Sequence, residues 1–407
     1  MAITILKNCL IFDGHNEELI EGNVVVENNR IREVTNSEVK IDSANNIDCK
    51  GGFLMPGLID AHFHALLVSY NIPKLDSMPP YLLAQHASHI LNGALHRGFT
   101  TVRDAGGAEI GLSMALEQGL IEGPRMFFSG KPISQTGGHG DMRPADHTSP
   151  CSCGYGSVLT TVADGVDEMR KTVREELRKG ANQIKLFVSG GVVSPTDPIW
   201  MAQFSADEIR VAVEEAATRR TYVMAHCHTD ARARACVELG IRTIEHGTEI
   251  QADTAEIIAN SDTYVVPTLS AIKVITDHGA ELGLPPMSLE KVTGLFQTNQ
   301  QSVSNCDKAN VKLGFGTDLL GDFHKYQNDE FVYRAELQKN IDVLRSATSV
   351  NADIIQKTGE LGCIKENALA DIILVAGNPL QDINLLSKPG ENISMIMRDG
   401  KIVKNQL

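Results

Sequence analysis

The chain begins and ends in short segments where apolar and polar residues alternate, and its middle follows a different pattern. Alternation of this kind, interrupted by turn residues, predicts β-strands. The alternating segments are 2–14, 21–34, 45–57, 370–378 and 394–405. Asp399-Gly400 is a favoured hairpin turn within the last of them. We therefore predict a small β-sandwich domain built from residues 1–52 and 364–407 together.

The middle of the chain carries short apolar segments that end in glycine or polar residues, with helical patterns between them. There are eight of these segments, at 53–65, 100–107, 124–130, 183–191, 222–229, 243–247, 263–269 and 312–318. Residues 165–180 and 205–220 have helical periodicity, and the second begins with a capping box, Ser205 followed by Glu208. Eight β-then-α units predict a (β/α)8 TIM barrel over residues 53–363. A doubly wound sheet is the competing topology.

Composition and charge narrow the class of protein. The chain has 407 residues, 42% hydrophobic and 22% charged, which is typical of a globular protein. No apolar run approaches the roughly 18 residues of a membrane span, and the N-terminal segment lacks the features of a signal peptide. A net charge of −14 argues against nucleic-acid binding.

The positions of the cysteines indicate in which cellular compartment the protein works. All eight are scattered along the chain, which favours reduced thiols in a cytoplasm. The CSCG sequence at 151–154 has no second cysteine pair at zinc-finger spacing, so we interpret it as a loop feature.

The first barrel segment contains GLIDAHFHALL, in which three polar residues are spaced two apart. In a strand, Asp60, His62 and His64 share one face while apolar residues take the other. Unpaired polar groups on a buried strand cost a few kcal/mol each. Two explanations stay open: the polar face binds a metal ion, or it is half-exposed to water.

Further polar residues come at the ends of the other barrel segments. The carboxyl ends of barrel strands form the active-site face. The residues expected there are His62, His64, Lys185, His226, His228, His246 and Asp318. Imidazoles, a lysine and a carboxylate around one barrel mouth form a metal-binding set.

Lys185 is unusual because it lies within an apolar strand. Burial lowers the pKa of a lysine, and a neutral amine can capture CO2 as a carbamate, an anion with two oxygens that can bridge two divalent ions. The alternative is that the side chain extends out of the strand end into water.

Several motifs together resemble the metal-dependent amidohydrolase superfamily. They are PGLIDAHFH, GFTTVRDAGG, SQTGGHGD, IKLFVSGGVVSPTDP, AHCHT, RTIEHG, GFGTDLLG and ADIILVAGNPL. The chain is similar in particular to the branch of imidazolonepropionase-like proteins and Xaa-Pro dipeptidases (prolidases). The resemblance extends over nearly the whole chain.

The resemblance implies a role for each of the polar residues. His62 and His64 would bind a buried metal, a carbamate on Lys185 would bridge, and His226 and His246 would bind a more exposed metal. Zinc suits such ligands. Asp318 would contact the buried metal and carry the proton from a bridging hydroxide to the leaving amine.

The resemblance also indicates substrate-binding residues. His139, in the TGGHGD loop, would hydrogen-bond the substrate carbonyl; without the resemblance it could equally be a flexible loop residue. Strand geometry alone lets either His226 or His228 be the ligand, and the family pattern assigns His228 to the substrate carboxylate. Trp200 could cover the pocket or pack on the surface. We expect His324 to be solvated.

These inferences predict a cytoplasmic, binuclear zinc amidohydrolase that cleaves a small amide, first an Xaa-Pro dipeptide. An N-acyl or aryl-acyl amino acid, or a cyclic amide, is the alternative substrate, as in ochratoxin-cleaving or imidazolonepropionase-like enzymes. A non-catalytic binding module on a barrel is the alternative from another class. A mononuclear iron oxygenase would need fewer ligands than are present. The resemblance implies a homo-oligomer.

Overall fold

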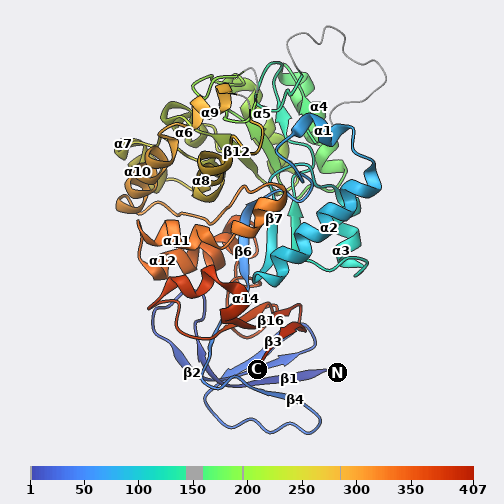
Figure 1. Cartoon of the computed structure of the whole chain (residues 1–407), viewed down its shortest axis with the longest axis vertical. Coiled ribbons are helices and arrows are strands. Elements are labelled where there is room, and N and C mark those ends of the chain that lie inside the picture. The colour runs from blue at the N-terminus through green and yellow to red at the C-terminus, as the bar shows by residue number, and fades with distance from the viewer. Residues whose placement is uncertain (1, 144–158, 195–196, 285) are drawn as a thin grey trace.

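The structure is a computed structural model, and it describes residues 2–143, 159–194, 197–284 and 286–407. Cys151 and Cys153, which we interpret as part of a loop, lie outside the described residues. Figure 1 shows a large body of helices and strands with a smaller β-rich part below it, where both chain ends lie.

The smaller part is an eight-stranded sheet that takes strands from both ends of the chain. Its strands are β1 (Ile3–Ile11), β2 (Ile20–Glu27), β3 (Arg30–Thr35), β4 (Asn45–Asp48), β5 (Phe53–Pro56), β15 (Ile372–Val375), β16 (Ile393–Arg398) and β17 (Lys401–Asn405). The strand order is β17-β16-β15-β5-β1-β2-β3, and β4 also pairs with β1. The antiparallel pair β5–β15 joins the two ends, so the prediction that they meet in one β-domain is confirmed.

The register of β1 shifts between Leu6 and Cys9, and one edge of this strand pairs with two different strands. The first half of β1 pairs with β4 and the second half with β5. Asn8, with a φ of 55°, lies at this irregularity. A bulge bends a strand and redirects its pairing, so the sheet can fold around its own apolar core. That core includes Leu6, Val24, Leu54, Ile372 and Met395.

The larger part is a closed barrel of parallel strands. They are β6 (Leu58–Phe63), β7 (Phe99–Asp104), β8 (Arg125–Phe128), β11 (Ile184–Phe187), β12 (Val223–Cys227), β13 (Thr243–His246) and β14 (Tyr264–Val266). The short strands β9 (Ile133–Ser134) and β10 (Thr161–Val162) continue the sheet beside β11. Asn182 N donates to Phe128 O at 2.8 Å and links the two barrel sheets.

Residues 313–318 close the barrel without forming a regular strand, which corrects our expectation for the eighth segment. Gly314 N donates to Val265 O on β14, and Ala61 N on β6 donates to Phe315 O, both at 2.8 Å. A side chain at Gly316 would meet His62 Cβ at 2.7 Å. The segment therefore lies too close to β6 for ordinary strand packing, and glycine permits that approach.

The expected strand at 53–65 is also corrected, because it is two strands. Its first part is β5 of the terminal sheet, and β6 of the barrel begins after Gly57. A Cβ at Gly57 would meet Thr100 Oγ1 at 2.1 Å, so only glycine fits where the chain passes from one sheet to the other.

Helices surround the barrel strands (Figure 1). They are α1 (Ile72–Asp76), α2 (Pro80–His96), α3 (Ile110–Glu117), α4 (Val166–Arg178), α5 (Ala206–Thr218), α6 (Asp230–Glu238), α7 (Ala252–Ala259), α8 (Leu269–His278), α9 (Pro286–Val292), α10 (Leu295–Lys308), α11 (Asp329–Ala335), α12 (Asn340–Arg345) and α13 (Asn351–Ile354). Helix α14 (Pro389–Asn392) packs instead beside β16 of the terminal sheet. Non-α helical turns are η1 (Gly321–Tyr326), η2 (Ser346–Val350) and η3 (Ile383–Ser387). The TIM-barrel prediction is confirmed.

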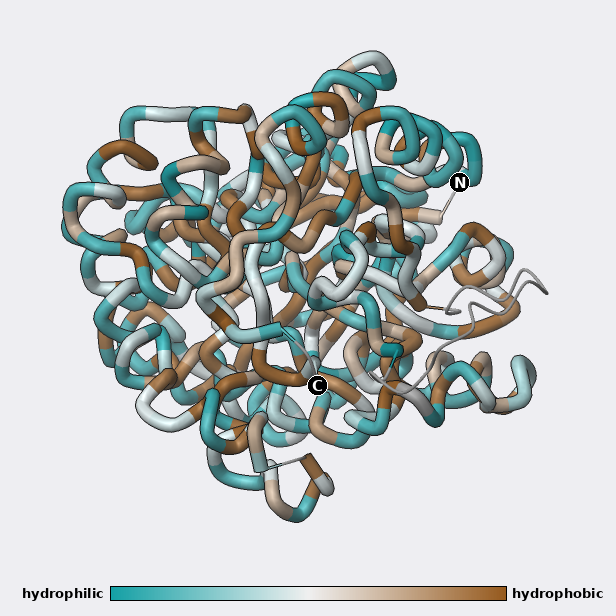
Figure 2. Tube along the Cα trace, turned by 90° about the horizontal axis from the view of Figure 1, so that it is seen from above, coloured by the Kyte–Doolittle hydropathy of each residue, from teal (hydrophilic) through white to brown (hydrophobic). Residues whose placement is uncertain are grey.

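Local helix predictions are also confirmed. Ser205 accepts from Glu208 N and the Glu208 side chain accepts from Ser205 N, which completes the predicted capping box of α5. Figure 2 shows hydrophobic segments mainly toward the centre and hydrophilic ones on the outer helices. Within the described ranges, none of the helices has the length and apolar character needed to cross a bilayer.

Candidate active site

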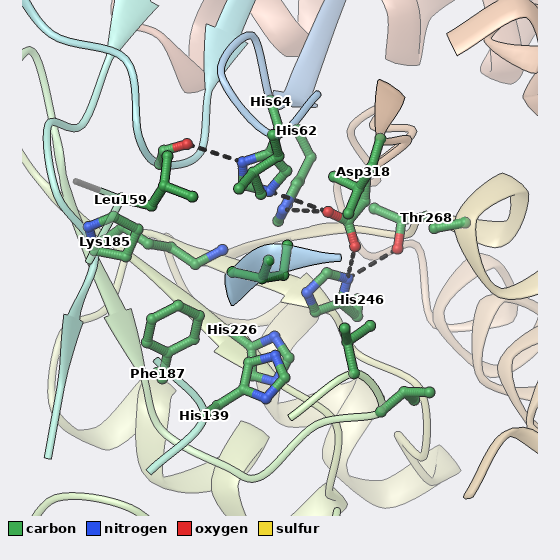
Figure 3. A pocket seen from close by; sticks show the side chains of 18 of the residues that line it. His62, His64, His139, Leu159, Lys185, Phe187, His226, His246, Thr268 and Asp318 are labelled. Atoms are coloured by element: carbon green, nitrogen blue, oxygen red, sulfur yellow. Dashed lines mark hydrogen bonds and ion pairs between the residues drawn. The ribbon is translucent and has the colours of Figure 1, made fainter. Parts of the chain in front are cut away.

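One cavity at the barrel mouth gathers the polar residues expected at the strand ends. His62, His64, His139, Lys185, His226, His228, His246 and Asp318 all line it. Figure 3 shows the labelled members of this set directed toward a common space. The cavity has an empty volume of about 930 Å³, including its open mouth. The fold therefore brings these eight side chains together around a single centre.

The backbone is strained at two of these positions. His246 has a φ of 68° and Asp318 a φ of 53°, although neither is glycine. Left-handed backbone at such residues costs about 1–3 kcal/mol each and is concentrated at functional sites. The barrel thus holds both side chains in orientations that relaxed strand ends would not give.

Asp318 lies at the centre of the cluster. Its Oδ1 is 3.1 Å from His64 Nε2 and 3.4 Å from His62 Nε2, and its Oδ2 is 3.8 Å from His246 Nδ1. Ligand atoms of His62, His246 and Asp318 all lie within 4.8 Å of one another. Burial alone would raise the pKa of Asp318, but the neighbouring His62, His64 and His246 together outweigh burial and the pKa falls well below its usual value. Asp318 is therefore a carboxylate at neutral pH.

Each histidine expected to bind metal has one ring nitrogen engaged by the protein. Nδ1 of His62 is 2.7 Å from Glu245 Oε2, and Nδ1 of His64 is 3.0 Å from Gly106 O. His246 Nδ1 is 2.8 Å from Thr268 Oγ1, and His226 Nε2 is 3.2 Å from Gly190 O. Such partners fix ring orientation and leave the other nitrogen for a metal. The donor set and its orientation fit divalent metal binding.

The protonation of two histidines also suits metal binding. Desolvation lowers the pKa of His226 and of His246 well below the ordinary histidine value. Both are neutral imidazoles at pH 7, which is the form that binds metal ions.

Lys185 lies inside the barrel, with 2% of its surface exposed. Desolvation is the main cause that lowers its pKa, to about 8. About a tenth of the amine is then neutral at pH 7, far more than for a lysine in water. The Lys185 side chain lines the cavity and does not extend into solvent as the alternative interpretation required.

A buried ion pair supports His62 from below the cavity. Arg103 Nη2, on β7, is 2.8 Å from Glu245 Oε1 on β13, and its Nε donates to Ala61 O at 2.6 Å. Burial would raise the pKa of Glu245, but the Arg103 guanidinium, together with His62 and Lys185, outweighs burial and lowers the pKa to about 2. The carboxylate that orients His62 is thus itself held by an arginine across the barrel.

We expect Arg103→Met to destabilise the fold by about 3–5 kcal/mol, because it leaves a buried carboxylate without its counter-ion. The pKa of Glu245 is lower in the folded protein than in the unfolded chain, so the ion pair stabilises fully above pH ~4.3 and its contribution is lost as the pH falls toward ~2. Chemical denaturation at several pH values measures both effects. Arg178→Met, which breaks an exposed pair, is the matched control and should leave stability nearly unchanged. Equal losses in the two variants would contradict this account.

Two expected positions are corrected by the structure. Trp200 has 77% of its surface exposed and does not line the cavity. Met201 N bonds to Pro198 O and Gly190 N to Met201 O, so Trp200 lies at the tip of a tight return of the chain that faces solvent. His324, expected to be solvated, is 3% exposed and packs on Phe63 with ring centroids 4.5 Å apart.

Sequence reasoning missed the residues behind the cavity. Glu245 directly precedes His246, yet nothing local shows that it contacts β6. Asp60 shares a strand face with the two histidines but does not line the cavity: it accepts from Thr317 Oγ1 at 2.6 Å and from Gln327 Nε2 at 2.9 Å. Asp60 therefore ties β6 to the segment that carries Asp318.

The fold and the site define a class: a barrel hydrolase whose mouth carries a metal-binding set. A family model described as the amidohydrolase family matches residues 53–403, and the chain belongs to that family. It is a hydrolase that acts on amide bonds, in the prolidase-like branch. This result sets aside the non-catalytic binding module.

Individual relatives are similar over almost the whole chain. A crystal structure of a prolidase complexed with N-methylphosphonate-L-proline is 45% identical, with a TM-score of 0.96 and full coverage of both chains. A Xaa-Pro dipeptidase with bound methionine is 27% identical, with a TM-score of 0.88 over 99% of this chain and 100% of that one. Ochratoxinase of Aspergillus niger is 29% identical over 99% of this chain and 87% of the relative.

Proposed function

We propose that this protein is a metal-dependent dipeptidase that hydrolyses the peptide bond of Xaa-Pro dipeptides. The observation that carries the proposal is the convergence of Asp318 with His62, His64 and His246 in one cavity at the barrel mouth. The 45% identical prolidase and the Xaa-Pro dipeptidase support the substrate class.

We further propose two divalent ions, zinc in each case, as the cofactor. His62 and His64 would hold one ion and His226 and His246 the other, with Asp318 on the first. Lys185, carboxylated by CO2, would supply two oxygens between the ions. Ions bound there polarise a scissile carbonyl and lower the pKa of a water molecule.

Side chains of the protein itself carry out the proton transfer and bind the substrate. Asp318 accepts the proton of the attacking water and delivers it to the leaving nitrogen, since its carboxylate is ionised and faces the cavity. His139 is placed to hydrogen-bond the carbonyl oxygen as negative charge develops there. His228, with Nδ1 bound to Thr248 Oγ1 at 2.7 Å, offers its other nitrogen to the substrate carboxylate.

The rest of the cavity wall is mostly apolar and sets the size of the substrate. Leu67 and Tyr70 come from the loop after β6, Ile72 begins α1, and Ile272 and Ile275 come from α8. Such walls bind side chains by excluding water and leave orientation to the few polar groups. A small molecule with apolar substituents fits this lining.

A panel of dipeptides tests the proposal. The zinc-loaded protein should release amino acids from Xaa-Pro dipeptides with kcat/KM of about 10⁴ M⁻¹s⁻¹ or more, the usual range for a true substrate. Dialysis against a chelator should abolish the activity, and zinc should restore it. Matched Xaa-Gly dipeptides control for general peptidase activity. Hydrolysis of N-aryl-acyl amino acids but of no dipeptide would reject the dipeptidase proposal.

That outcome would favour the second candidate, hydrolysis of an N-acyl or aryl-acyl amino acid or a cyclic amide. The similarity to ochratoxinase over 99% of the chain supports this candidate. The apolar cavity wall accommodates an aromatic acyl group equally well.

The assembly and the compartment are also proposals. We propose a homo-oligomer, because the resemblance to this branch of the superfamily implies one. We propose a reducing cytoplasm because the six described cysteines are all free and buried.

A further inference from the structure

A lysine from a distant helix forms hydrogen bonds with the loop after β11. Lys291 lies in the last turn of α9, and its Nζ donates to three backbone carbonyls. The acceptors are Gly191 O at 2.9 Å, Ser194 O at 3.0 Å and Asp197 O at 2.7 Å. One ammonium thereby uses all three of its N–H groups on a single loop.

The same loop also contacts the imidazole ring of His139. Ser194 Oγ is 2.8 Å from His139 Nδ1, and Asp197 Oδ2 is 3.4 Å from that nitrogen. A Cβ at Gly191 would meet His139 Cε1 at 2.2 Å, so the loop backbone lies directly against the imidazole. The three residues whose carbonyls bind Lys291 also contact the His139 ring.

Asp197 connects the loop to the backbone of His139 as well. Its Oδ2 accepts from Gly191 N at 3.0 Å and from Gln203 Nε2 at 3.2 Å. Gln203 Oε1 in turn accepts from His139 N at 3.0 Å. The Asp197 side chain is fully buried, so this carboxylate is committed to the loop and is not a solvated surface charge.

The other faces of the His139 ring are also fixed. The ring stacks on His226 with centroids 4.3 Å apart and an interplanar angle of 16°, and it meets Phe187 edge-on at 5.2 Å. Nε2 has no hydrogen-bond partner within the described ranges. The contacts thus restrain the ring on several sides and leave one nitrogen for a ligand.

We propose that Lys291 and Asp197 are positioning residues for His139: Lys291 holds the loop in place, and Asp197 and Ser194 on that loop fix the imidazole. This inference rests on the proposed function, in which His139 binds the carbonyl oxygen. Lys291 does not line the cavity, so it acts on the reaction only through the loop.

A double-mutant cycle separates positioning from simple structural support. Lys291→Met in the zinc-loaded enzyme should lower kcat for an Xaa-Pro dipeptide about tenfold to a hundredfold, because small displacements of an active group cost this much. In a His139→Ala background the same change should lower kcat less than about twofold, because the group it positions is gone. Lys308→Met, also in a last helical turn but exposed, is the control and should match the parent.

Asp197→Asn is the second variant, in case Lys291→Met does not fold. An amide oxygen in place of Oδ2 can keep the bonds from Gly191 and Gln203 while the charge facing His139 is lost. Its kcat should also fall in the parent and change little in the His139→Ala background. Equal losses in both backgrounds, for either variant, would overturn the inference.

Hydrogen–deuterium exchange provides a readout that does not need turnover. Lys291→Met should speed exchange both in residues 188–194 and around His139, whereas Lys308→Met should not. If the parent cleaves no dipeptide, the proposed function fails and exchange alone decides: faster exchange at His139 supports the positioning role. Faster exchange confined to 188–194 would refute it.

Discussion

Asp318→Asn is expected to lower kcat by about a thousandfold, because it removes the group that accepts and returns the proton. The change in KM should be small, since the asparagine has the same shape and the cavity lining is otherwise intact. The carboxylate is available as a proton acceptor because it is ionised at neutral pH, and its Oδ1 lies 3.1 Å from His64 Nε2 and 3.4 Å from His62 Nε2. Steady-state kinetics on an Xaa-Pro dipeptide measure the loss.

Metal analysis shows whether Asp318→Asn loses activity through lost proton transfer or through lost metal. The four histidines and Lys185 remain in this variant, so most of the metal should stay bound after dialysis. Asp322→Asn, an exposed carboxylate four residues further on, is the matched control and should behave like the parent. A variant at Asp318 that keeps parental turnover would exclude the proton-transfer role.

Lys185→Ala is expected to have the second large effect, a loss of at least about a thousandfold in kcat/KM together with most of the bound metal. The side chain is buried in the cavity and its pKa is lowered to about 8, so carbamate formation is accessible near neutral pH. Without that anion, two cations would lie close together with only Asp318 to neutralise them. Metal content and kinetics of the purified variant test this expectation, with the exposed Lys171→Ala as control.

Two measurements detect the carbamate on Lys185 directly. Apoprotein reconstituted with zinc should regain activity faster in bicarbonate than in CO2-depleted buffer, and labelled CO2 should give a carbamate carbon signal in the holoenzyme. An unmodified lysine in the active, metal-loaded protein would rule the bridging role out.

The barrel and the polar residues at its mouth could be predicted because both leave local marks in the sequence. Strand alternation and helix periodicity fix element types, and a polar residue at the end of an apolar segment marks the barrel mouth. The partners that orient those residues leave no such mark. Arg103 and Glu245 are 142 residues apart, and their contact exists only once β7 and β13 face each other across the barrel. Likewise, nothing local to Lys291 indicates that it binds carbonyls about a hundred residues earlier.

The predictions that the structure corrects failed for physical reasons that hydrophobic periodicity does not reveal. The segment 312–318 has the composition of a strand, but close approach to β6 through Gly316 replaces regular pairing. Trp200 is turned outward by a tight chain reversal. His324 is drawn inward because its ring covers Phe63 and its Nε2 lies 3.2 Å from His64 O.

The pairing of β5 with β15 has a consequence for biosynthesis. β5 runs through Gly57 directly into β6, the strand that carries His62, yet its partner β15 is made more than three hundred residues later. On a ribosome that adds roughly 5–20 residues per second, β5 would wait many seconds with one edge unpaired. Nascent chains stalled before Ile372 should therefore be prone to aggregation and to chaperone binding.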